Sequence, residues 1–488
     1  MKHILTLILG FLLLAACSHH SESPAVLNAH LWAPDVHAAL TDFTQRNAHQ
    51  GHYVVFDFDN TTSIFDIEEQ MRIYQLQTMS FAMDPQQLRQ ALSADLTAWD
   101  EANYADWLTD IDHAYTTLWD TYGPFTPQGV DSATIQQMQA DPQWQEFATK
   151  MAQLYEVVCD HEDIDVAYCW ILYWTTGMTP QELYTLARRS DAYYSQVPSA
   201  SITWTSPADL PSRVGQVNCQ WTAGVSVTTN LRELWNTLSS QGIDVWVCSA
   251  SGVDQVKAAI DEFGLHDYCT GILAMTVSLD EQEKYLPQYE LEQSHIWRTL
   301  PHGEWQQEDL CTHARTGGKG KVTAIQNTLL PFYGEGPIAG FCDSSGDFNF
   351  CTEFSSLQLV VCFNRAYRKV TEGGGLMALV ALYERDQLGY DLEKALADGN
   401  TLYVLQGRDE NGLRSLRQSN LTLRLDSTQE RLYANEDNER LLRHITQHKP
   451  TVAQIFNQFA LATPADAPDN PLGIAYGWLT DYDGYHSK

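Results

Sequence analysis

Basic residues are scarce in this chain. Its 488 residues include 29 Lys and Arg against 62 Asp and Glu, which gives a formal net charge of −33. A surface this acidic repels nucleic acid and anionic lipid surfaces, so we expect neither as a partner. The cysteines form no CxxC pair and no His/Cys cluster with the spacing of a zinc site. Beyond the N-terminus, the sequence also lacks a run of about 20 apolar residues, the length that a transmembrane helix needs.

The N-terminus has the features of an export signal. The apolar run Ile4–Ala16 follows a basic start and is too short to span a membrane. It ends in Leu14–Cys17, which resembles the bacterial lipobox, where the cysteine is lipidated and becomes the first residue. We therefore expect residues 1–16 to be removed, Cys17 to carry the lipid, and residues 17–31 to form a polar tether. The protein would be exported and anchored to a bacterial membrane by this lipid alone, facing the periplasm or the cell exterior; an ordinary signal peptide with a chance cysteine is the alternative.

A short apolar run ends in two closely spaced carboxylates. Tyr53–Phe56 has the continuous apolar character of a parallel strand that is covered by helices on both faces. Asp57 and Asp59 follow it, and ligands of open α/β sheets bind just beyond the carboxyl ends of such strands. Two carboxylates this close resist ionising together unless a cation compensates them. A hard cation with oxygen ligands, Mg²⁺, is therefore the expected cofactor.

Two kinds of pattern follow along the chain, which has 44% hydrophobic residues and can bury more than one core. Residues 63–225 are rich in Trp and Tyr and carry helix-start signals. Asp84–Gln87 and Thr179–Glu182 each supply an N-cap residue, a Pro and a capping-box partner. We interpret this stretch as a helical cap inserted after the first strand. From Thr229 onward strands and helices alternate, apart from residues 278–316, which look polar and irregular.

Four signals fall at consecutive strand ends or helix starts. They are Asp57 and Asp59 with Thr61, then Ser249, then Lys321 at a glycine-flanked helix start, then Asp343 and Asp347. In this order they resemble the motifs of the haloacid dehalogenase superfamily of phosphotransferases, over about residues 50–365. The resemblance implies an α/β fold with a Rossmann-like core and a parallel sheet (32–62 and 226–372), the helical cap (63–225), and a C-terminal α/β extension of unknown role (373–488).

The resemblance also implies a role for each acidic residue. Asp57 would be the nucleophile that forms an aspartyl-phosphate. Asp59 would act as general acid toward the leaving oxygen and then as general base toward water. Mg²⁺ would be held by the side chains of Asp57 and Asp343 and by the backbone carbonyl of Asp59, with Asp347 supporting the metal or the lysine.

The remaining motif residues would bind the phosphoryl oxygens, and these are Ser249, Thr61 and Lys321. Lys319 stays open as an alternative to Lys321. The implied function is that of an exported, Mg²⁺-dependent phosphomonoesterase that hydrolyses a small phosphorylated metabolite. A phosphotransferase or phosphomutase with the same nucleophile is one alternative, and a lipoprotein that binds a ligand without catalysis is another.

The stretch after the first motif bears on the substrate. The final acidic motif and the cap position match the phosphoserine-phosphatase-like branch of the superfamily, and Asn60–Glu69 resembles secreted phosphorylcholine phosphatases. Asp66, Glu68 and Glu69 would then stand at the cap entrance and, with nearby aromatic rings, receive a cationic head group. The aromatics considered for this role are Trp170 and Trp174. Alternatively, these acids only begin a solvated helix, where carboxylates interact favourably with the N-terminal dipole.

Overall fold

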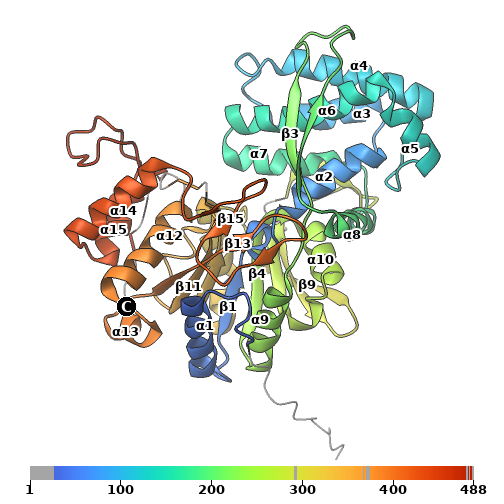
Figure 1. Ribbon diagram of the computed structural model, residues 1–488. Helices are drawn as coiled ribbons and strands as arrows, with labels where there is room; N and C mark the ends of the chain where they lie inside the picture. The colour runs from blue at the N-terminus through green and yellow to red at the C-terminus, as the bar shows by residue number, and fades with distance from the viewer. Residues whose placement is uncertain are drawn as a thin grey trace, which may run out of the picture.

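The computed structural model describes residues 27–290, 294–366, 368–369, 374–479, 482, 484 and 485. The predicted lipidation site Cys17 and the predicted signal segment lie outside the described residues. Figure 1 shows a helical lobe standing above one part of a central sheet, with the C-terminal helices beside the other part. Within the described ranges, every helix is too short or too polar to cross a bilayer.

An eight-stranded sheet forms the core, and six of its strands run parallel, with β8 and β9 as an antiparallel edge. This confirms the predicted α/β class with a mostly parallel sheet. In spatial order the strands are β12 (Leu402–Gln406), β11 (Leu359–Phe363), β10 (Ala339–Cys342), β1 (Tyr53–Phe56), β4 (Asp244–Gly252), β5 (Gly271–Met275), β8 (His295–Leu300) and β9 (Glu304–Cys311).

Alternate residues of β1 face two different apolar cores. Val54 and Phe56 pack on one side of the sheet, and Tyr53 and Val55 pack on the other. Because helices cover both faces, all four residues of β1 are buried and apolar. The first face is covered by α1 (Pro34–Asn47), α9 (Thr229–Ser240) and α10 (Val253–Glu262); the second is covered by α11 (Lys319–Tyr333) and α12 (Gly374–Tyr383), with α14 (Glu436–His448) and α15 (Val452–Phe459) packed on α12.

The segment between β1 and α9 forms the predicted helical cap. The capping boxes at Asp84 and Thr179 are formed as the sequence predicts. A hairpin of β2 (Ala200–Thr205) and β3 (Asn218–Ala223) crosses the helices and was not predicted. The α-helices of the cap are α2 (Ile67–Thr78), α3 (Pro85–Ser93), α4 (Tyr104–Tyr122), α5 (Ser132–Gln139), α6 (Pro142–His161), α7 (Ile164–Trp170) and α8 (Pro180–Gln196).

The chain enters and leaves the cap at one place. Ile64 and Ser226 form an antiparallel bridge there, with amide-to-carbonyl distances of 2.8 and 3.2 Å. The cap also rests on the core through α8, where the Tyr184 hydroxyl donates to Asp261 at 2.7 Å. The entry point of the cap is thus close to the end of β1, where the predicted nucleophile lies.

The expectation of irregular structure over residues 278–316 was wrong. β6 (Val277–Leu279) and β7 (Tyr285–Tyr289) form a hairpin, and β8 and β9 form the antiparallel edge of the main sheet. Most side chains of β9 are exposed, because only one face of this edge is covered. A strand with so many polar residues does not show the continuous apolar run that marks the central strands.

The C-terminal residues complete the central sheet. β12 pairs in parallel with β11, after α13 (Leu392–Ala397). A small sheet of two-residue strands then lies between the cap and the C-terminal helices (Figure 1). Its strands are β13 (Arg408–Asp409), β14 (Ser415–Leu416), β15 (Thr422–Leu423) and β16 (Glu430–Arg431). The segment with no predicted role therefore reaches the same edge of the sheet as the predicted site.

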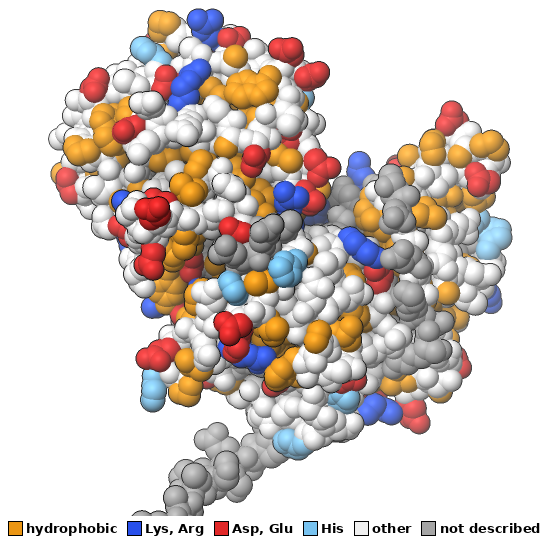
Figure 2. Space-filling model, turned by 180° about the vertical axis from the view of Figure 1, so that it is seen from behind, with side chains coloured by type: hydrophobic (Ala, Val, Ile, Leu, Met, Phe, Trp, Pro, Cys, Tyr) orange, Lys and Arg blue, Asp and Glu red, His pale blue; other side chains and the backbone are white. Residues whose placement is uncertain are grey.

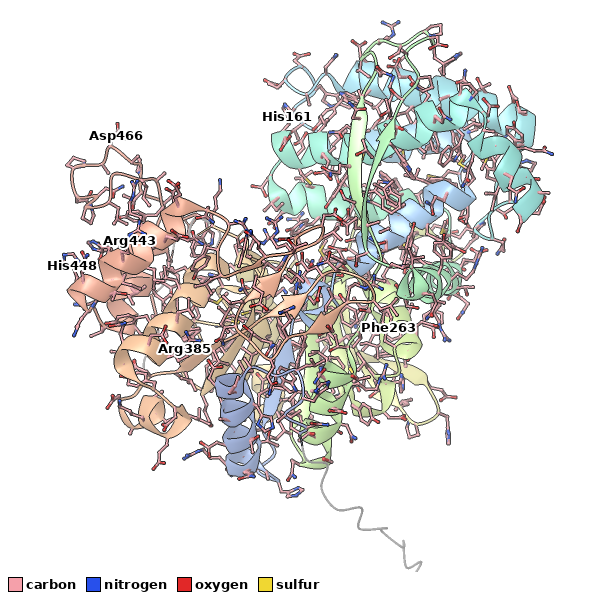
Figure 3. The ribbon with its side chains drawn as sticks, viewed as in Figure 1. His161, Phe263, Arg385, Arg443, His448 and Asp466 are labelled. Carbon is pink, nitrogen blue, oxygen red and sulfur yellow. The ribbon has the colours of Figure 1, made fainter. Side chains whose placement is uncertain are left out.

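Charged side chains are spread over the outer surface. Figure 2 shows separate acidic and basic side chains over the reverse face of both lobes. In Figure 3, His161 lies on the outside of the cap, and Arg443 and Asp466 lie on the outside of the C-terminal lobe. All three are exposed. The unusual concentration of charge is buried instead, at the carboxyl edge of the parallel strands.

Candidate active site

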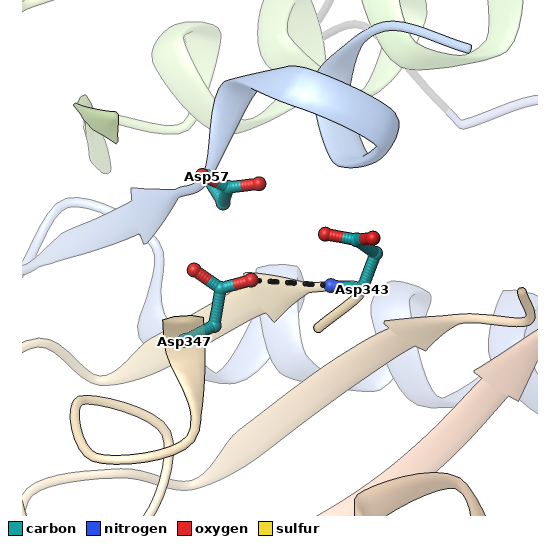
Figure 4. A group of neighbouring side chains, drawn as sticks. All are labelled: Asp57, Asp343 and Asp347. Atoms are coloured by element: carbon teal, nitrogen blue, oxygen red, sulfur yellow. Dashed lines mark hydrogen bonds between the residues drawn. The ribbon is translucent and has the colours of Figure 1, made fainter. Parts of the chain in front are cut away.

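The carboxyl edge of the parallel sheet gathers the predicted site residues. Asp57 follows β1 directly, and Asp343 follows β10, which pairs with β1. Ser249 lies in β4 on the other side of β1, and Lys321 comes from the first turn of α11. Because parallel strands end on the same side of a sheet, residues far apart in the sequence meet here (Figure 4).

Three carboxylates and one lysine form the centre of the site. The Lys321 ammonium lies 2.7 Å from Asp57 Oδ1 and 2.6 Å from Asp347 Oδ1. The backbone amide of Asp343 donates to Asp347 Oδ2 at 3.3 Å (Figure 4). Each of the three buried aspartates offers an oxygen within 4.8 Å of the others. Such a group of carboxylate oxygens fits a hard divalent cation.

The buried carboxylates repel one another. Burial, and next the neighbouring Asp347, raise the pKa of Asp57 to about 8, against the opposing effect of Lys321. Burial also raises the pKa of Asp347 to about 6. Burial opposes ionisation of Asp343 too, but Arg365 is 2.8 Å away and the net effect lowers the pKa of Asp343. A divalent cation between Asp57 and Asp343 would supply the positive charge that Lys321 alone does not.

Asp59 lies beside this group in a different set of hydrogen bonds. Its Oδ2 accepts from the Ser251 hydroxyl at 2.6 Å, and its Oδ1 accepts from the Ile67 amide at 2.7 Å. Burial, and next the nearby Asp66, raise the pKa of Asp59 well above its usual value. A raised pKa favours the protonated carboxyl, which is the form that can give a proton to a leaving group.

The two predicted phosphate-binding hydroxyl residues, Ser249 and Thr61, differ in their surroundings. The Ser249 hydroxyl is buried, lies 3.5 Å from Asp59 Oδ2, and accepts from the Ser251 amide. Ser251 lines the site cavity beside it. The Thr61 hydroxyl donates to Asp343 Oδ1 at 3.4 Å, so it contacts the acidic group. The structure thus brings Ser249 and Thr61 close to the site and adds Ser251 to it.

The two candidate lysines differ in burial. The Lys321 side chain is 2% exposed and contacts the predicted nucleophile. The Lys319 side chain is 51% exposed and pairs with Glu353 at 2.5 Å. The geometry therefore favours Lys321 as the lysine that meets a phosphoryl group.

Two small cavities adjoin the acidic group. The first, about 140 Å³, lies over Asp57 and is lined from the cap by Glu68, Tyr155 and Tyr168. The second, about 160 Å³, extends into the cap and shares Asp66, Glu68 and Tyr155 with the first. The full lining of the second is Asp66, Glu68, Glu69, Arg72, Tyr155, Glu156 and Ile171. Of the predicted acids at the cap entrance, Asp66 and Glu68 line the cavity over Asp57, whereas Glu69 lines the second cavity.

The expectation that Trp170 and Trp174 face the site was wrong. Their side chains are 0% and 1% exposed, and the Trp170 indole donates to the Leu92 carbonyl inside the cap at 3.0 Å. Large rings at these positions fill the apolar interior of the cap. The aromatic walls of the site come instead from Tyr155 and Tyr168.

Sequence reasoning missed Ser251, Arg365 and Arg408. Ser251 lies two residues after Ser249, and the repeat Ser-Ala-Ser was the available signal. Arg365 and Arg408 each lie two residues beyond a parallel strand, β11 and β12. The rule that found Asp57 and Asp343, which looks just past strand ends, applies to both arginines. Both strands follow the last of the four recognised motifs, so no motif draws attention to these two arginines.

Comparisons with known proteins address the fold. A protein from Anaerococcus prevotii DSM 20548, described as conserved and functionally unknown, matches with 24% identity and a TM-score of 0.60, over 80% of this chain and 96% of its own. A protein of unknown function from Bordetella pertussis Tohama I matches with 11% identity and a TM-score of 0.33, over 72% of this chain and 97% of its own. The first similarity supports a shared fold, and the second is too weak to do so. No family model and no curated protein matches this sequence.

Proposed function

We propose that this chain is an exported, Mg²⁺-dependent phosphomonoesterase that works through an aspartyl-phosphate on Asp57. The observation that carries the proposal is the buried group in which Lys321 contacts both Asp57 and Asp347, within reach of Asp343. Asp59, with its raised pKa, lies beside this group. The order of these residues along the chain resembles that of the haloacid dehalogenase superfamily.

The proposed reaction has two steps, formation of the aspartyl-phosphate and its hydrolysis. A carboxylate oxygen of Asp57 attacks phosphorus, the bond from phosphorus to the leaving oxygen breaks, and Asp59 gives that oxygen its proton. A water then attacks phosphorus, Asp59 takes its proton, and the bond from phosphorus to Asp57 breaks to release phosphate. Lys321 holds phosphoryl oxygens in both steps and offsets their charge.

The residues present fit a bound Mg²⁺. Asp57 and Asp343 would hold it through their side chains and Asp59 through its backbone carbonyl, while Asp347 fixes Lys321. When bound, the ion neutralises negative charge on the transferred phosphoryl group. The donor set consists of oxygen atoms alone, which suits Mg²⁺ better than a soft metal.

For the substrate we propose a small phosphorylated metabolite with a cationic head group, such as phosphorylcholine. The second cavity has four acidic residues in its lining against one arginine. Burial raises the pKa of Glu68 to about 8 and that of Glu69 to about 7, and a cation beside them would favour their ionised forms. The Tyr155 ring already receives the Arg72 guanidinium at 4.2 Å, so it accepts cations.

The acids also serve the helix that they begin. Asp66 is the N-cap of α2 and accepts from the Glu69 amide at 2.9 Å. A purely structural role therefore competes with substrate selection. Glu68→Gln and Glu69→Gln separate the two when each is assayed on phosphorylcholine and on p-nitrophenyl phosphate. A selective loss on phosphorylcholine supports the cationic pocket, whereas a parallel loss on both substrates refutes it.

The competing functions are distinguished by their products. A phosphatase releases inorganic phosphate with water as the only acceptor, whereas a phosphotransferase or phosphomutase requires another acceptor. A binding lipoprotein releases none. An assay of phosphate release from a panel of phosphorylated metabolites, with Mg²⁺ and with a chelator, decides among them.

Attachment to the membrane is tested separately, at Cys17. In the lipobox interpretation its thiol accepts the lipid, so Cys17→Ser should leave a precursor or a soluble protein. Equal membrane partition of the wild type and Cys17→Ser after cell fractionation would refute this part of the proposal without affecting the phosphatase chemistry.

A further inference from the structure

Arg408 joins the C-terminal segment to the loop that carries the predicted nucleophile. It lies two residues beyond β12, and its side chain is 1% exposed. Its Nη1 donates to the backbone carbonyl of Asn60 at 2.8 Å, and its Nη2 lies 3.4 Å from the Asn60 side-chain oxygen. Asn60 is the residue between Asp59 and Thr61, so this contact falls inside the first motif.

The Arg408 guanidinium is itself held in place. Its Nε and Nη2 donate to Glu410 Oε1 at 3.0 and 2.8 Å. The other oxygen of Glu410 accepts from the Leu425 amide at 3.1 Å. Although burial alone would raise the pKa of Glu410, its pairing with Arg408 lowers it below the usual value. Glu410 thus fixes the guanidinium, and another edge of it is directed at Asn60.

Asn60 sets the direction of the backbone in this loop. Its φ of 61° and ψ of 0° place it in the left-handed region, which most residues with a side chain avoid and which Asn adopts more readily. The orientation of its two peptide groups fixes the Asp59 carbonyl on one side and Thr61 on the other. A hydrogen bond from a buried cation to the Asn60 carbonyl therefore holds the backbone on which both neighbours depend.

We propose that Arg408 is a positioning residue for the nucleophile loop, and that the C-terminal segment is in this way part of the active site. This inference rests on the proposed function for its catalytic consequence, but the positioning itself is a property of the structure. A planar guanidinium is required, because an ammonium cannot bind Glu410 through two nitrogens and still reach Asn60 in the same geometry. Arg408→Lys keeps the positive charge and should therefore retain only part of the positioning effect.

Arg414 supplies a matched control in the same segment. It is also buried, and its guanidinium donates to the carbonyls of Val197 at 2.9 Å and Val225 at 3.0 Å. These carbonyls belong to the chain near the base of the cap, and the hydrogen bonds of Arg414 do not include the nucleophile loop. Replacing either arginine by Met removes a buried charge and its hydrogen bonds, but only Arg408→Met should release Asn60.

Hydrogen–deuterium exchange tests the positioning without reference to activity. In the wild type, the Asn60 amide donates to Phe65 and the Ser63 amide donates to Phe58, which closes the loop. Arg408→Met should speed exchange of these two amides, while Arg414→Met should speed exchange near Val197 and Val225. Unchanged exchange at Asn60 and Ser63 in Arg408→Met would overturn the proposal. So would the same increase at these amides in both variants, because that indicates general loosening of the segment.

Kinetics test the catalytic consequence. Loss of a residue that orients a catalytic group without contacting the substrate typically lowers activity roughly 10- to 100-fold. Arg408→Met should lower kcat by this factor on p-nitrophenyl phosphate, with little change in KM, and Arg408→Lys should recover part of it. A change in KM alone would contradict the positioning role. If the wild type releases no phosphate from any substrate, the proposed function fails, and the exchange experiment still decides whether Arg408 holds the loop.

Discussion

The carboxyl edge of the core sheet and the aromatic centre of the cap bury opposite kinds of side chain, although the cap also buries an ion-pair group of Lys150 with Asp110 and Glu146. At the edge, Asp57, Asp343 and Asp347 are packed around one lysine. In the cap, Trp170 and Trp174 meet edge to face with ring centroids 6.1 Å apart. Buried charge that is not fully paired destabilises a fold, whereas buried aromatic rings stabilise it. The buried side chains at the edge are therefore explained by the chemistry of the site, and the aromatic side chains of the cap by their effect on stability. Substitutions in the two regions should separate activity from stability.

Asp57→Asn should produce the largest effect on activity. It removes the nucleophilic oxygen at nearly constant volume, and loss of a nucleophile lowers kcat by roughly 10⁴-fold or more. Stability should change little, because burial already raises the pKa of Asp57 to about 8 and the amide keeps the volume of the side chain. Phosphate release from p-nitrophenyl phosphate and thermal unfolding followed by circular dichroism measure the two properties. A large drop in the unfolding temperature would show that Asp57 has a structural role.

Asp59→Asn should have a smaller effect. General acid and base assistance contributes roughly 10²- to 10⁴-fold. The amide oxygen of Asn can still accept from the Ile67 amide, while its NH₂ group donates to the Ser251 hydroxyl instead of accepting from it. The loss should be greater on an alkyl phosphate, whose leaving group needs the proton, than on p-nitrophenyl phosphate. Equal losses on both substrates would remove Asp59 from the acid role.

Trp170→Ala tests the opposite region. Removing a fully buried Trp side chain lowers the free energy of unfolding by about 3–5 kcal/mol. Turnover of p-nitrophenyl phosphate well below the unfolding temperature should stay close to that of the wild type, since Trp170 does not face the site. Trp99→Ala is the matched control, because Trp99 is 38% exposed and its removal leaves no large internal cavity. Equal destabilisation by the two substitutions would contradict the description of the cap interior.

The smallest expected effect concerns pH and substrate choice, where the two regions meet. Burial, and next Asp66, raise the pKa of Glu68 to about 8, so this side chain becomes a carboxylate as the pH rises through about 8. Attraction for a cationic head group then increases. The ratio of kcat/KM for phosphorylcholine to that for an alkyl phosphate without a cationic group should rise over this range, since both leaving groups need the proton of Asp59 and titration of the shared catalytic groups cancels in the ratio. In Glu68→Gln the ratio should stay flat, and a rise that persists there would assign it to another group.

The parts of the site that could be predicted are those in which local pattern and chemistry coincide. Asp57 and Asp343 follow short, fully apolar strands, and a buried strand with a carboxylate at its end is unusual enough to be recognised. The α/β class and the inserted helical segment follow from the same alternation and from the capping boxes. The predicted metal ligands Asp57, Asp343 and Asp347 accordingly meet in one buried group.

The parts that could not be predicted depend on contacts between distant segments. The strand-end rule can mark Arg408 as a candidate, but the sequence around it does not reveal that β12 pairs with β11 or that Asn60 is its partner. In the same way, Trp170 and Tyr155 are both aromatic residues of the cap, and only the packing of α6 and α7 shows that Tyr155 lines the site. Residue type and spacing are local information, whereas which side of a helix faces the site is set by the whole fold.

The most direct test of the account is to locate the phosphoryl group on the protein. The wild type and Asp57→Asn are mixed with p-nitrophenyl phosphate and Mg²⁺, quenched, and treated with borohydride, which reduces an aspartyl-phosphate to homoserine. Tandem mass spectrometry then identifies the reduced residue. The account predicts homoserine at residue 57 in the wild type and none in Asp57→Asn. Homoserine at a different aspartate, or continued phosphate release by Asp57→Asn, would contradict it.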